Sequence, residues 1–270
     1  MATSQEWQLA GGAAERYASV LVPTILGPAA EALVRWVVPR PGEVVLDLGC
    51  GTGAATRAAA RAVGSAGHVF GVDVQPGMLD VAARTSPIGD TVEWIEGSAL
   101  ALPLPDHSVT LALGAQVLQF LPDRASALRE LKRVLQSGGR LAVSLWAPRA
   151  ESPWFDHLVR AVEAEIGPDV AGGLDAAFAL TDAAELESLL ASAGLTDVES
   201  THARLDLRIP GGAQFVRRHV AATPMAAGFT AAPGDVQEAV VARVAEGMRG
   251  YERGQDYVVP FTLVLGRARG

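Results

Sequence analysis

The sequence predicts an α/β fold with a doubly wound, mostly parallel β-sheet, and two observations carry this prediction. Short apolar stretches that suit buried strands alternate with longer segments of helical spacing throughout residues 43–146. A glycine-rich turn, LGCGTG at 48–53, also separates the first strand-like stretch of this region from its first helix-like segment. Such alternation is typical of a parallel sheet whose strands are joined by crossover helices.

The elements of this region follow one another at short intervals. The predicted strands are 43–48, 68–74, 91–96, 108–115 and 140–146, and the predicted helices are 54–63, 76–84 and 123–136. The helix over 123–136 has the clearest local signals, because Asp123 can cap its first turn and Gly138 and Gly139 can end it.

The segments on either side predict further helices and two more strands. Over 14–38 the helical spacing is broken by Pro23 and Pro28, so we expect two short helices there. Pro260 in the last strand predicts a sheet edge or a bulge. The expected elements after the region are, in order, a helix at 153–166, an Ala/Gly-rich loop at 171–179, a helix at 181–194, a strand at 198–209, helices near 212–222 and 235–250, and a strand at 256–268.

Composition limits the classes of function. The chain has 270 residues, 49% of them hydrophobic, which is enough to bury one substantial core without disulfides. Its formal net charge of -8 opposes binding to nucleic acid. Cys50 is the only cysteine and the five histidines lack metal-binding spacing, so we expect no disulfide and no metal site. Because neither a secretory signal nor an apolar run of roughly 20 residues is evident, we expect a cytoplasmic protein without a membrane partner.

The glycine-rich turn suits a ligand at the N-terminus of a helix. Gly49, Gly51 and Gly53 allow backbone amides to approach a ligand closely. No Lys-Ser/Thr pair follows, so the turn is not a phosphate-binding P-loop. It fits a dinucleotide fingerprint, and Asp73, 20 residues after Gly53, suits the two hydroxyls of a ribose. Both nicotinamide dinucleotides and S-adenosylmethionine present such a ribose.

Asp47 separates these two cofactors by charge. A carboxylate beside a pyrophosphate would cost on the order of a few kcal/mol at an effective dielectric constant of about 20. S-adenosylmethionine instead brings an ammonium and a sulfonium group, which the carboxylate would attract. Asp47 could also have a structural role by bonding the turn amides. The sequence therefore favours S-adenosylmethionine, and an NAD(P)-dependent oxidoreductase is the weaker alternative because no Tyr-x-x-x-Lys pair is present.

Four segments together resemble one family. They are VLDLGCGTG at 45–53, GVDVQPGMLDVAA at 71–83, EGSALALPLPDHSVTLALGAQVLQFLPD at 96–123 and ALRELKRVLQSGGRLAVSLW at 127–146. In this order and spacing they resemble the class I S-adenosylmethionine-dependent methyltransferases of the small-molecule type, a group that includes ubiquinone/menaquinone C-methyltransferases. The resemblance covers roughly 40–148 and implies a Rossmann-like fold with a seven-stranded sheet.

With this resemblance the chain divides into three expected regions. Residues 1–40 would form an N-terminal helical cap, and residues 41–148 the S-adenosylmethionine-binding core. Residues 149–270 would complete the sheet and add helical insertions that form a lid over the acceptor site.

The resemblance also implies the cofactor contacts. It places Gly49, Cys50 and Gly51 against the methionine part, Asp73 on the ribose hydroxyls, Val74 and Met78 around the adenine, Ser98 and Ala99 at the adenine edge, and Gln116 beside the methyl-transfer centre. Tyr17 and Asp47 complete the predicted cofactor set. The family often has Asp where this chain has Ser98, whose hydroxyl can still bond the adenine amino group with less charge assistance.

The acceptor is predicted to be a small, largely apolar metabolite, methylated on oxygen or carbon. Because the methyl donor is already activated, alignment and exclusion of water suffice and a base is optional. His157 is a candidate base and Gln119 a second candidate catalytic residue. Trp146 and Trp154 are predicted to line the acceptor pocket, and the other aromatic residues outside the cofactor motifs include Trp7, Phe155 and Phe215. An S-adenosylmethionine-binding cyclase or a regulatory protein without methyl transfer is the alternative.

Overall fold

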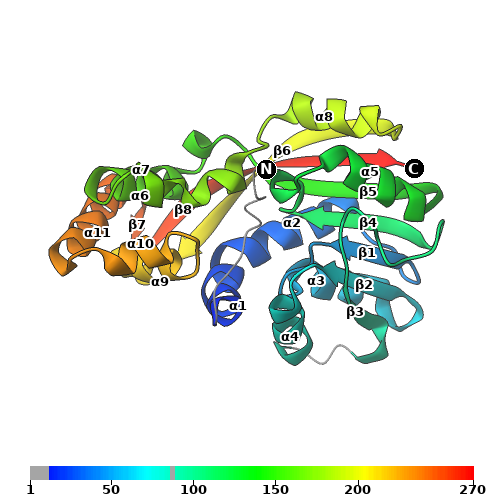
Figure 1. Cartoon of the computed structure of the whole chain (residues 1–270), viewed down its shortest axis with the longest axis horizontal. Helices are drawn as coiled ribbons and strands as arrows, with labels where there is room; N and C mark the ends of the chain where they lie inside the picture. Colours follow the sequence, from blue (N-terminus) through cyan, green and yellow to red (C-terminus); the bar gives the residue numbers. More distant parts are fainter. Residues whose placement is uncertain (1–11, 86–88) are drawn as a thin grey trace, which may run out of the picture. The chain divides into compact units, whose positions relative to one another are not determined.

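The computed structural model describes residues 12–85 and 89–270, so Trp7 lies outside the described residues (Figure 1). The chain forms two compact units, each built from separate segments. Unit 1 consists of Met1–Pro28, Trp146–Ala179 and Arg204–Leu263, and unit 2 of Ala29–Leu145, Leu180–Ala203 and Val264–Gly270. The region expected over 149–270 is therefore divided between the two units.

The β-sheet has the predicted doubly wound, mostly parallel form. Its strands are β1 (Val44–Leu48), β2 (His68–Asp73), β3 (Val92–Glu96), β4 (Val109–Ala115), β5 (Leu135–Trp146), β6 (Thr196–Ile209) and β8 (Asp256–Arg269). They lie in the order β3-β2-β1-β4-β5-β8-β6, and the two-residue β7 (Glu252–Arg253) pairs with β8. β1 pairs in parallel with β2 and β4, as do β2 with β3 and β4 with β5. The strand order reverses between β1 and β4, the position where open α/β sheets bind their ligands.

Four helices of unit 2 begin within about two residues of their predicted starts. They are α3 (Ala54–Val63), α4 (Pro76–Thr85), α5 (Arg124–Val134) and α8 (Ala183–Ser192). Unit 2 also contains most of α2 (Gly27–Val37). Asp123 caps α5 as predicted, because its Oδ1 accepts a hydrogen bond from the Ser126 amide at 2.9 Å. The predicted end of α5 is wrong. Leu135 is extended and pairs with Val109 of β4, so Gly138 and Gly139 lie inside β5.

The prediction of two short N-terminal helices is wrong, because one helical stretch runs from Ala13 to Val37. Its segments are α1 (Ala13–Arg16), the π-helix η1 (Tyr17–Leu26) and α2. Pro23 would interrupt an α-helical ladder, but here the Gly27 amide donates to the Val22 carbonyl, five residues back. A Cβ at position 27 would lie 2.5 Å from that oxygen, so glycine permits the wider turn.

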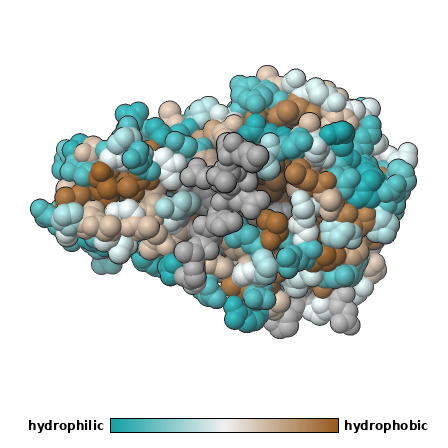
Figure 2. All heavy atoms as spheres, in the orientation of Figure 1, coloured by the Kyte–Doolittle hydropathy of each residue, from teal (hydrophilic) through white to brown (hydrophobic). Residues whose placement is uncertain are grey.

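This stretch, Ala13–Val37, is also the one helix of the described residues that is long and apolar enough to cross a membrane. The criterion is length and composition alone, and buried helices of soluble proteins meet it too. Half of the qualifying window is buried inside the protein, at 50%. On the face shown in Figure 2, hydrophobic residues are dispersed among hydrophilic ones.

Unit 1 is mainly helical and has an aromatic core. Its helices are α6 (Pro153–Glu165), α7 (Pro168–Ala171), α9 (Phe215–Ala221), α10 (Ala226–Ala231) and α11 (Gly234–Met248), with α6 packed on α11. The prediction of a loop over 171–179 is wrong, because Gly172–Phe178 forms a 3₁₀ helix. Pro260 lies in β8, which is placed between β5 and β6 in the sheet, and whether it marks a local edge or a bulge stays a prediction. Whether the helices of unit 1 act as a lid stays a prediction.

Candidate cofactor-binding site

The turn that follows β1 requires its three glycines. Gly49, Gly51 and Gly53 have positive φ angles of 63°, 54° and 85°, which residues with a Cβ seldom adopt. A Cβ at Gly49 would lie 2.4 Å from Cγ2 of Val117, and one at Gly53 would lie 2.4 Å from the ring of Trp94. The turn therefore lies close to its neighbours and leads directly into the N-terminus of α3.

Asp73 ties the end of β2 to this turn. Its Oδ2 accepts a hydrogen bond from the Gly51 amide at 2.8 Å, and its Oδ1 accepts one from the Gln75 amide at 2.9 Å. Burial raises the pKa of Asp73, and the backbone donors oppose that shift. Because each carboxylate oxygen can accept more than one hydrogen bond, Asp73 keeps acceptor capacity for a ligand.

Asp47 lies beneath the turn and is only 1% exposed. Its Oδ2 accepts a hydrogen bond from the Thr56 hydroxyl of α3 at 2.6 Å, whereas its buried Oδ1 has no hydrogen-bond partner among the described residues. Burial raises the pKa of Asp47 to about 7, with the charge of Asp73 adding to the shift and Thr56 and Arg57 opposing it. The contact with Thr56 is a structural role, and when Asp47 is ionised its Oδ1 would carry negative charge that a cation could stabilise.

Cys50 is a packing residue in this turn. It is 7% exposed, and its Sγ lies 3.7 Å from the Gly51 carbonyl oxygen. Burial, with the charges of Asp47 and Asp73, raises the pKa of the Cys50 thiol well above its ordinary value. The thiol therefore stays protonated at neutral pH, which makes it a poor nucleophile.

Two exposed apolar side chains, Val74 and Leu100, follow the strands whose ends are predicted to hold the adenine. Among the described residues, three large apolar side chains are exposed, namely Val38, Val74 and Leu100. Val74 follows β2, and Leu100 follows β3, its parallel neighbour. Sequence reasoning does not single out Leu100, although it directly follows Ser98 and Ala99. Met78, by contrast, is buried in α4 and 5% exposed.

Two glutamines form a pair at the end of β4. Gln116 has a positive φ of 56°, which is uncommon for a residue with a side chain. The backbone amide of Gln116 donates to the backbone carbonyl of Ser144 at 3.0 Å. Between the side chains, Gln119 Nε2 donates to Gln116 Oε1 at 2.9 Å. Gln119 is buried, and its Oε1 has no hydrogen-bond partner among the described residues. The strained backbone and the orphaned oxygen lie at the switch point of the sheet.

The remaining predicted site residues belong to unit 1. Trp154 is 0% exposed, and its Nε1 donates to Nδ1 of His219 at 3.2 Å. Trp146 is 2% exposed and contacts the rings of two phenylalanines. His157 lies against α11, because a Cβ at Gly247 would be 2.2 Å from its Nδ1. Tyr17 is half-buried in the π-helix. The contacts of Trp146, Trp154 and His157 are packing contacts, and contact of any of these four residues with a cofactor or an acceptor stays a prediction.

His219 of α9 is a buried titratable residue that the sequence does not reveal. It is 2% exposed, and burial lowers the pKa of His219 to about 3. It is therefore neutral at physiological pH, with Nδ1 accepting from the Trp154 indole. Nothing in the local sequence FVRRHVA signals this contact, because Trp154 is 65 residues away.

Comparison with known proteins connects this site to one family. Residues 46–143 match the family described as a methyltransferase domain. The 2-phytyl-1,4-naphtoquinone methyltransferase of Synechococcus elongatus is 40% identical over 113 residues, 41% of this chain and 48% of that protein. The ubiquinone/menaquinone biosynthesis C-methyltransferase of Vibrio vulnificus is 38% identical over 128 residues, 46% of this chain and 48% of that protein. The chain thus spans about half the length of these relatives.

A solved structure resembles the chain over nearly all its length. It is a phosphoethanolamine N-methyltransferase of Haemonchus contortus in complex with phosphomonomethylethanolamine and S-adenosylhomocysteine. It is 14% identical with a TM-score of 0.61, covering 95% of this chain and 56% of that one, which shows a shared fold. The matched residues 46–143 contain the glycine turn, Asp73 and strands β2–β4. Over residues 46–143, the chain is therefore similar to the family described as a methyltransferase domain.

Proposed function

We propose that this protein transfers a methyl group from S-adenosylmethionine to an oxygen or carbon of a small, largely apolar metabolite. The observation that carries the proposal is the bond between Asp73 and the Gly51 amide, which places a carboxylate with free acceptor capacity at the glycine turn. The match to a methyltransferase domain covers both residues. The names of the two relatives, which refer to quinones with long apolar tails, support an apolar acceptor.

The residues of unit 2 suit each part of the cofactor. The open backbone of Gly49 and Gly51 would hold the methionine part, and Asp73 would accept the ribose hydroxyls. Val74 and Leu100 offer exposed apolar surface for the adenine. Asp47, whose buried Oδ1 has no partner within residues 12–85 and 89–270, would act through space on the ammonium and sulfonium charges. When bound, S-adenosylmethionine supplies a methyl group on a cationic sulfur that is already activated for transfer.

The protein's own contribution to transfer is alignment. An in-line displacement requires the acceptor atom opposite the sulfur and little water between them. Gln116 and Gln119 at the end of β4 are placed to orient an acceptor hydroxyl or carbonyl, since their mutual hydrogen bond fixes both side chains. His157 as a base, and Trp146 and Trp154 as walls of the acceptor site, belong to the same proposal.

We further propose that the protein acts in the cytoplasm and binds neither nucleic acid nor membrane. The net charge of -8 supports the first exclusion. The half-buried window of Ala13–Val37 supports a helix of the protein core rather than one inserted in lipid.

The test is to follow S-adenosylhomocysteine during incubation of the protein with S-adenosylmethionine and a panel of quinols, phenols and enolisable ketones. Methyl transfer predicts that S-adenosylhomocysteine and a product heavier by one methylene accumulate in equal amounts. A cyclase or a regulatory protein would change the acceptor, or bind it, without forming S-adenosylhomocysteine. A Gly49→Ala protein provides a matched control, because the added Cβ would crowd the glycine turn.

A further inference from the structure

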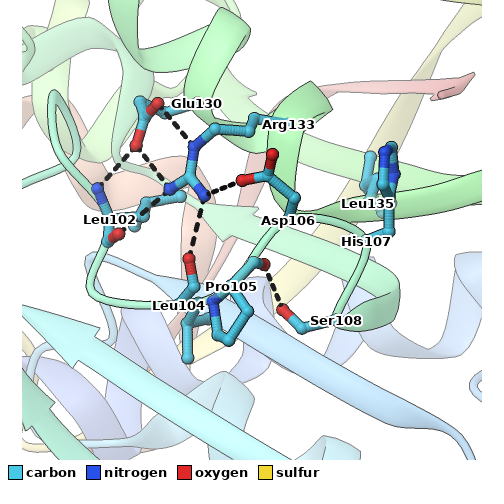
Figure 3. Close-up of polar contacts among 9 residues, drawn as sticks. All are labelled: Leu102, Leu104, Pro105, Asp106, His107, Ser108, Glu130, Arg133 and Leu135. Carbon is cyan, nitrogen blue, oxygen red and sulfur yellow. Dashed lines mark hydrogen bonds and ion pairs between the residues drawn. The ribbon is translucent and has the colours of Figure 1, made fainter.

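Two residues of α5 clamp the connection between β3 and β4. Figure 3 shows Arg133 reaching from α5 between Glu130 and Asp106, toward the backbone of Leu102 and Leu104. Its Nε donates to Glu130 Oε1 at 2.9 Å, and its Nη2 donates to Glu130 Oε2 at 2.8 Å. The other donors reach Leu104 O at 2.9 Å, Asp106 Oδ1 at 2.7 Å and Leu102 O at 3.0 Å. All five N–H groups of the guanidinium are thus engaged.

Glu130 of the same helix also binds the connection between β3 and β4. Its Oε2 accepts a hydrogen bond from the Leu102 amide at 2.8 Å, so both backbone groups of Leu102 are bonded to α5. The side chains of Arg133 and Glu130 are 31% and 21% exposed, and their contact is bidentate. A fork-shaped pair of this kind is more directional and stronger than a single ion pair on the surface. Lysine could not reproduce it, because it lacks the planar array of donors.

The clamped residue ends a tight turn, 97–102, that contains the predicted adenine edge. Within the turn, the Ser98 hydroxyl accepts from the Leu100 amide at 3.1 Å, and the Ser98 carbonyl accepts from the Ala101 amide at 3.2 Å. At its start, the Gly97 amide donates to the Asp73 carbonyl at 3.0 Å. The turn is therefore fixed at one end to the residue proposed for the ribose and at the other end to α5.

The connection depends on these partners because it has little structure of its own. Residues 97–108, all within the described part of the chain, contain neither a helix nor a named strand. Two prolines, Pro103 and Pro105, cannot donate backbone hydrogen bonds. The carbonyls of Leu102 and Leu104 and the amide of Leu102 obtain partners from α5.

We propose that Glu130 and Arg133 are positioning residues that fix the turn 97–102 and thereby give the site its preference for adenine over other purines. This inference rests on the proposed function. Recognition of the edge of a base requires donors and acceptors held within a fraction of an ångström. A loosened turn would still offer apolar surface through Leu100, but Ser98 would no longer keep a fixed place for the 6-amino group.

The test compares two ligands on four proteins by calorimetry. The ligands are S-adenosylhomocysteine and S-inosylhomocysteine, in which an oxo group replaces the 6-amino group. The wild type is expected to prefer the adenine compound by about tenfold, the value of one well-placed hydrogen bond. Arg133→Met and Glu130→Gln are expected to reduce that preference to about twofold or less. Arg129→Met on the same helix is the control, because Arg129 is exposed and its Nη2 bonds only locally, to Ser126 Oγ at 2.8 Å.

The outcomes separate this inference from the proposed function. A folded Arg133→Met protein that keeps the full preference, or a wild type without preference, overturns the positioning role while leaving the proposed function intact. Absence of S-adenosylhomocysteine binding to the folded wild type overturns the proposed function itself. If Arg133→Met does not fold, Asp106→Asn, which alters one partner of the clamp, replaces it, and an unchanged preference then counts against the inference. A merely structural role would lower stability without changing the ratio of the two affinities.

Discussion

The carboxylate of Asp73 and the backbone amide of Gly51 are joined by a hydrogen bond of 2.8 Å. This bond connects the end of β2 to the glycine turn after β1, two neighbouring parallel strands. It holds together the two features that a ribose-bearing cofactor would use. Several properties of the protein should depend on this arrangement.

Replacing Asp73 by alanine should weaken binding of S-adenosylhomocysteine by at least about tenfold, or about 1.4 kcal/mol. The ribose hydroxyls would lose a charged acceptor, and the glycine turn would lose its bond to β2. Calorimetric titration measures the change, with Asp80→Ala on the exposed face of α4 as the control. An unchanged affinity in Asp73→Ala would remove this residue from the site.

Asp47 should make folding stability depend on pH. Because burial raises the pKa of Asp47 from 3.8 to about 7, the folded state holds its proton at pH values where the unfolded chain has released it. This contribution to stability is present below about pH 4 and is lost as the pH rises toward 7. As the pH rises from about 4 to 7, the denaturant concentration at the unfolding midpoint of the wild type should therefore fall relative to that of Asp47→Asn. Parallel pH profiles of the two proteins would contradict the raised pKa.

The same residue should make cofactor affinity depend on pH. A cation at the turn favours ionised Asp47, so the affinity for S-adenosylmethionine should rise between pH 6 and 8, around the pKa of about 7. Asp47→Asn should show a flat profile and weaker binding than the wild type at pH 8. Titrations of both proteins in one buffer series test this. If both profiles were equally steep, another group would be responsible.

Two glycines with positive φ angles should respond differently to alanine. Gly49→Ala would place a Cβ 2.4 Å from Val117 at a φ of 63°, whereas Gly211, which is left-handed with a φ of 75° and a ψ of 14°, has nothing within 4 Å. We expect Gly211→Ala to cost about 1 kcal/mol of unfolding free energy and Gly49→Ala about 2 to 4 kcal/mol, because overpacking adds to strain. Denaturant unfolding measures both. Equal losses would show that the close contact with Val117 relaxes without cost.

The strands and helices of residues 43–146 could be predicted because their signals are local. Each strand of this region carries its own apolar run, and Asp123 caps α5 through a residue three positions away. One failure came from an unusual local geometry, and another from a contact between residues far apart in the sequence. Pro23 is accommodated by a π-helix, and the pairing of Leu135 with Val109 ends α5 before Gly138 is reached.

Only part of the geometry around the candidate site could be predicted, and the binding roles of its residues stay predictions. The glycine turn and Asp73 follow from spacing, and the positive φ angles show why glycine is required there. The Thr56 partner of Asp47 and the clamp of Arg133 depend on α3 and α5 packing against strands and loops. The contact of Trp154 with His219 joins residues far apart in the sequence. Such tertiary contacts have no signature in a single sequence.

We propose above all that the glycine turn and Asp73 bind an adenosyl cofactor and not a dinucleotide. The most direct measurement is a pair of calorimetric titrations of the folded wild-type protein, with S-adenosylhomocysteine and with NADH. We expect saturable binding of S-adenosylhomocysteine that is weakened in Asp73→Ala, and no measurable binding of NADH. Saturable binding of NADH, with none of S-adenosylhomocysteine, would contradict this proposal.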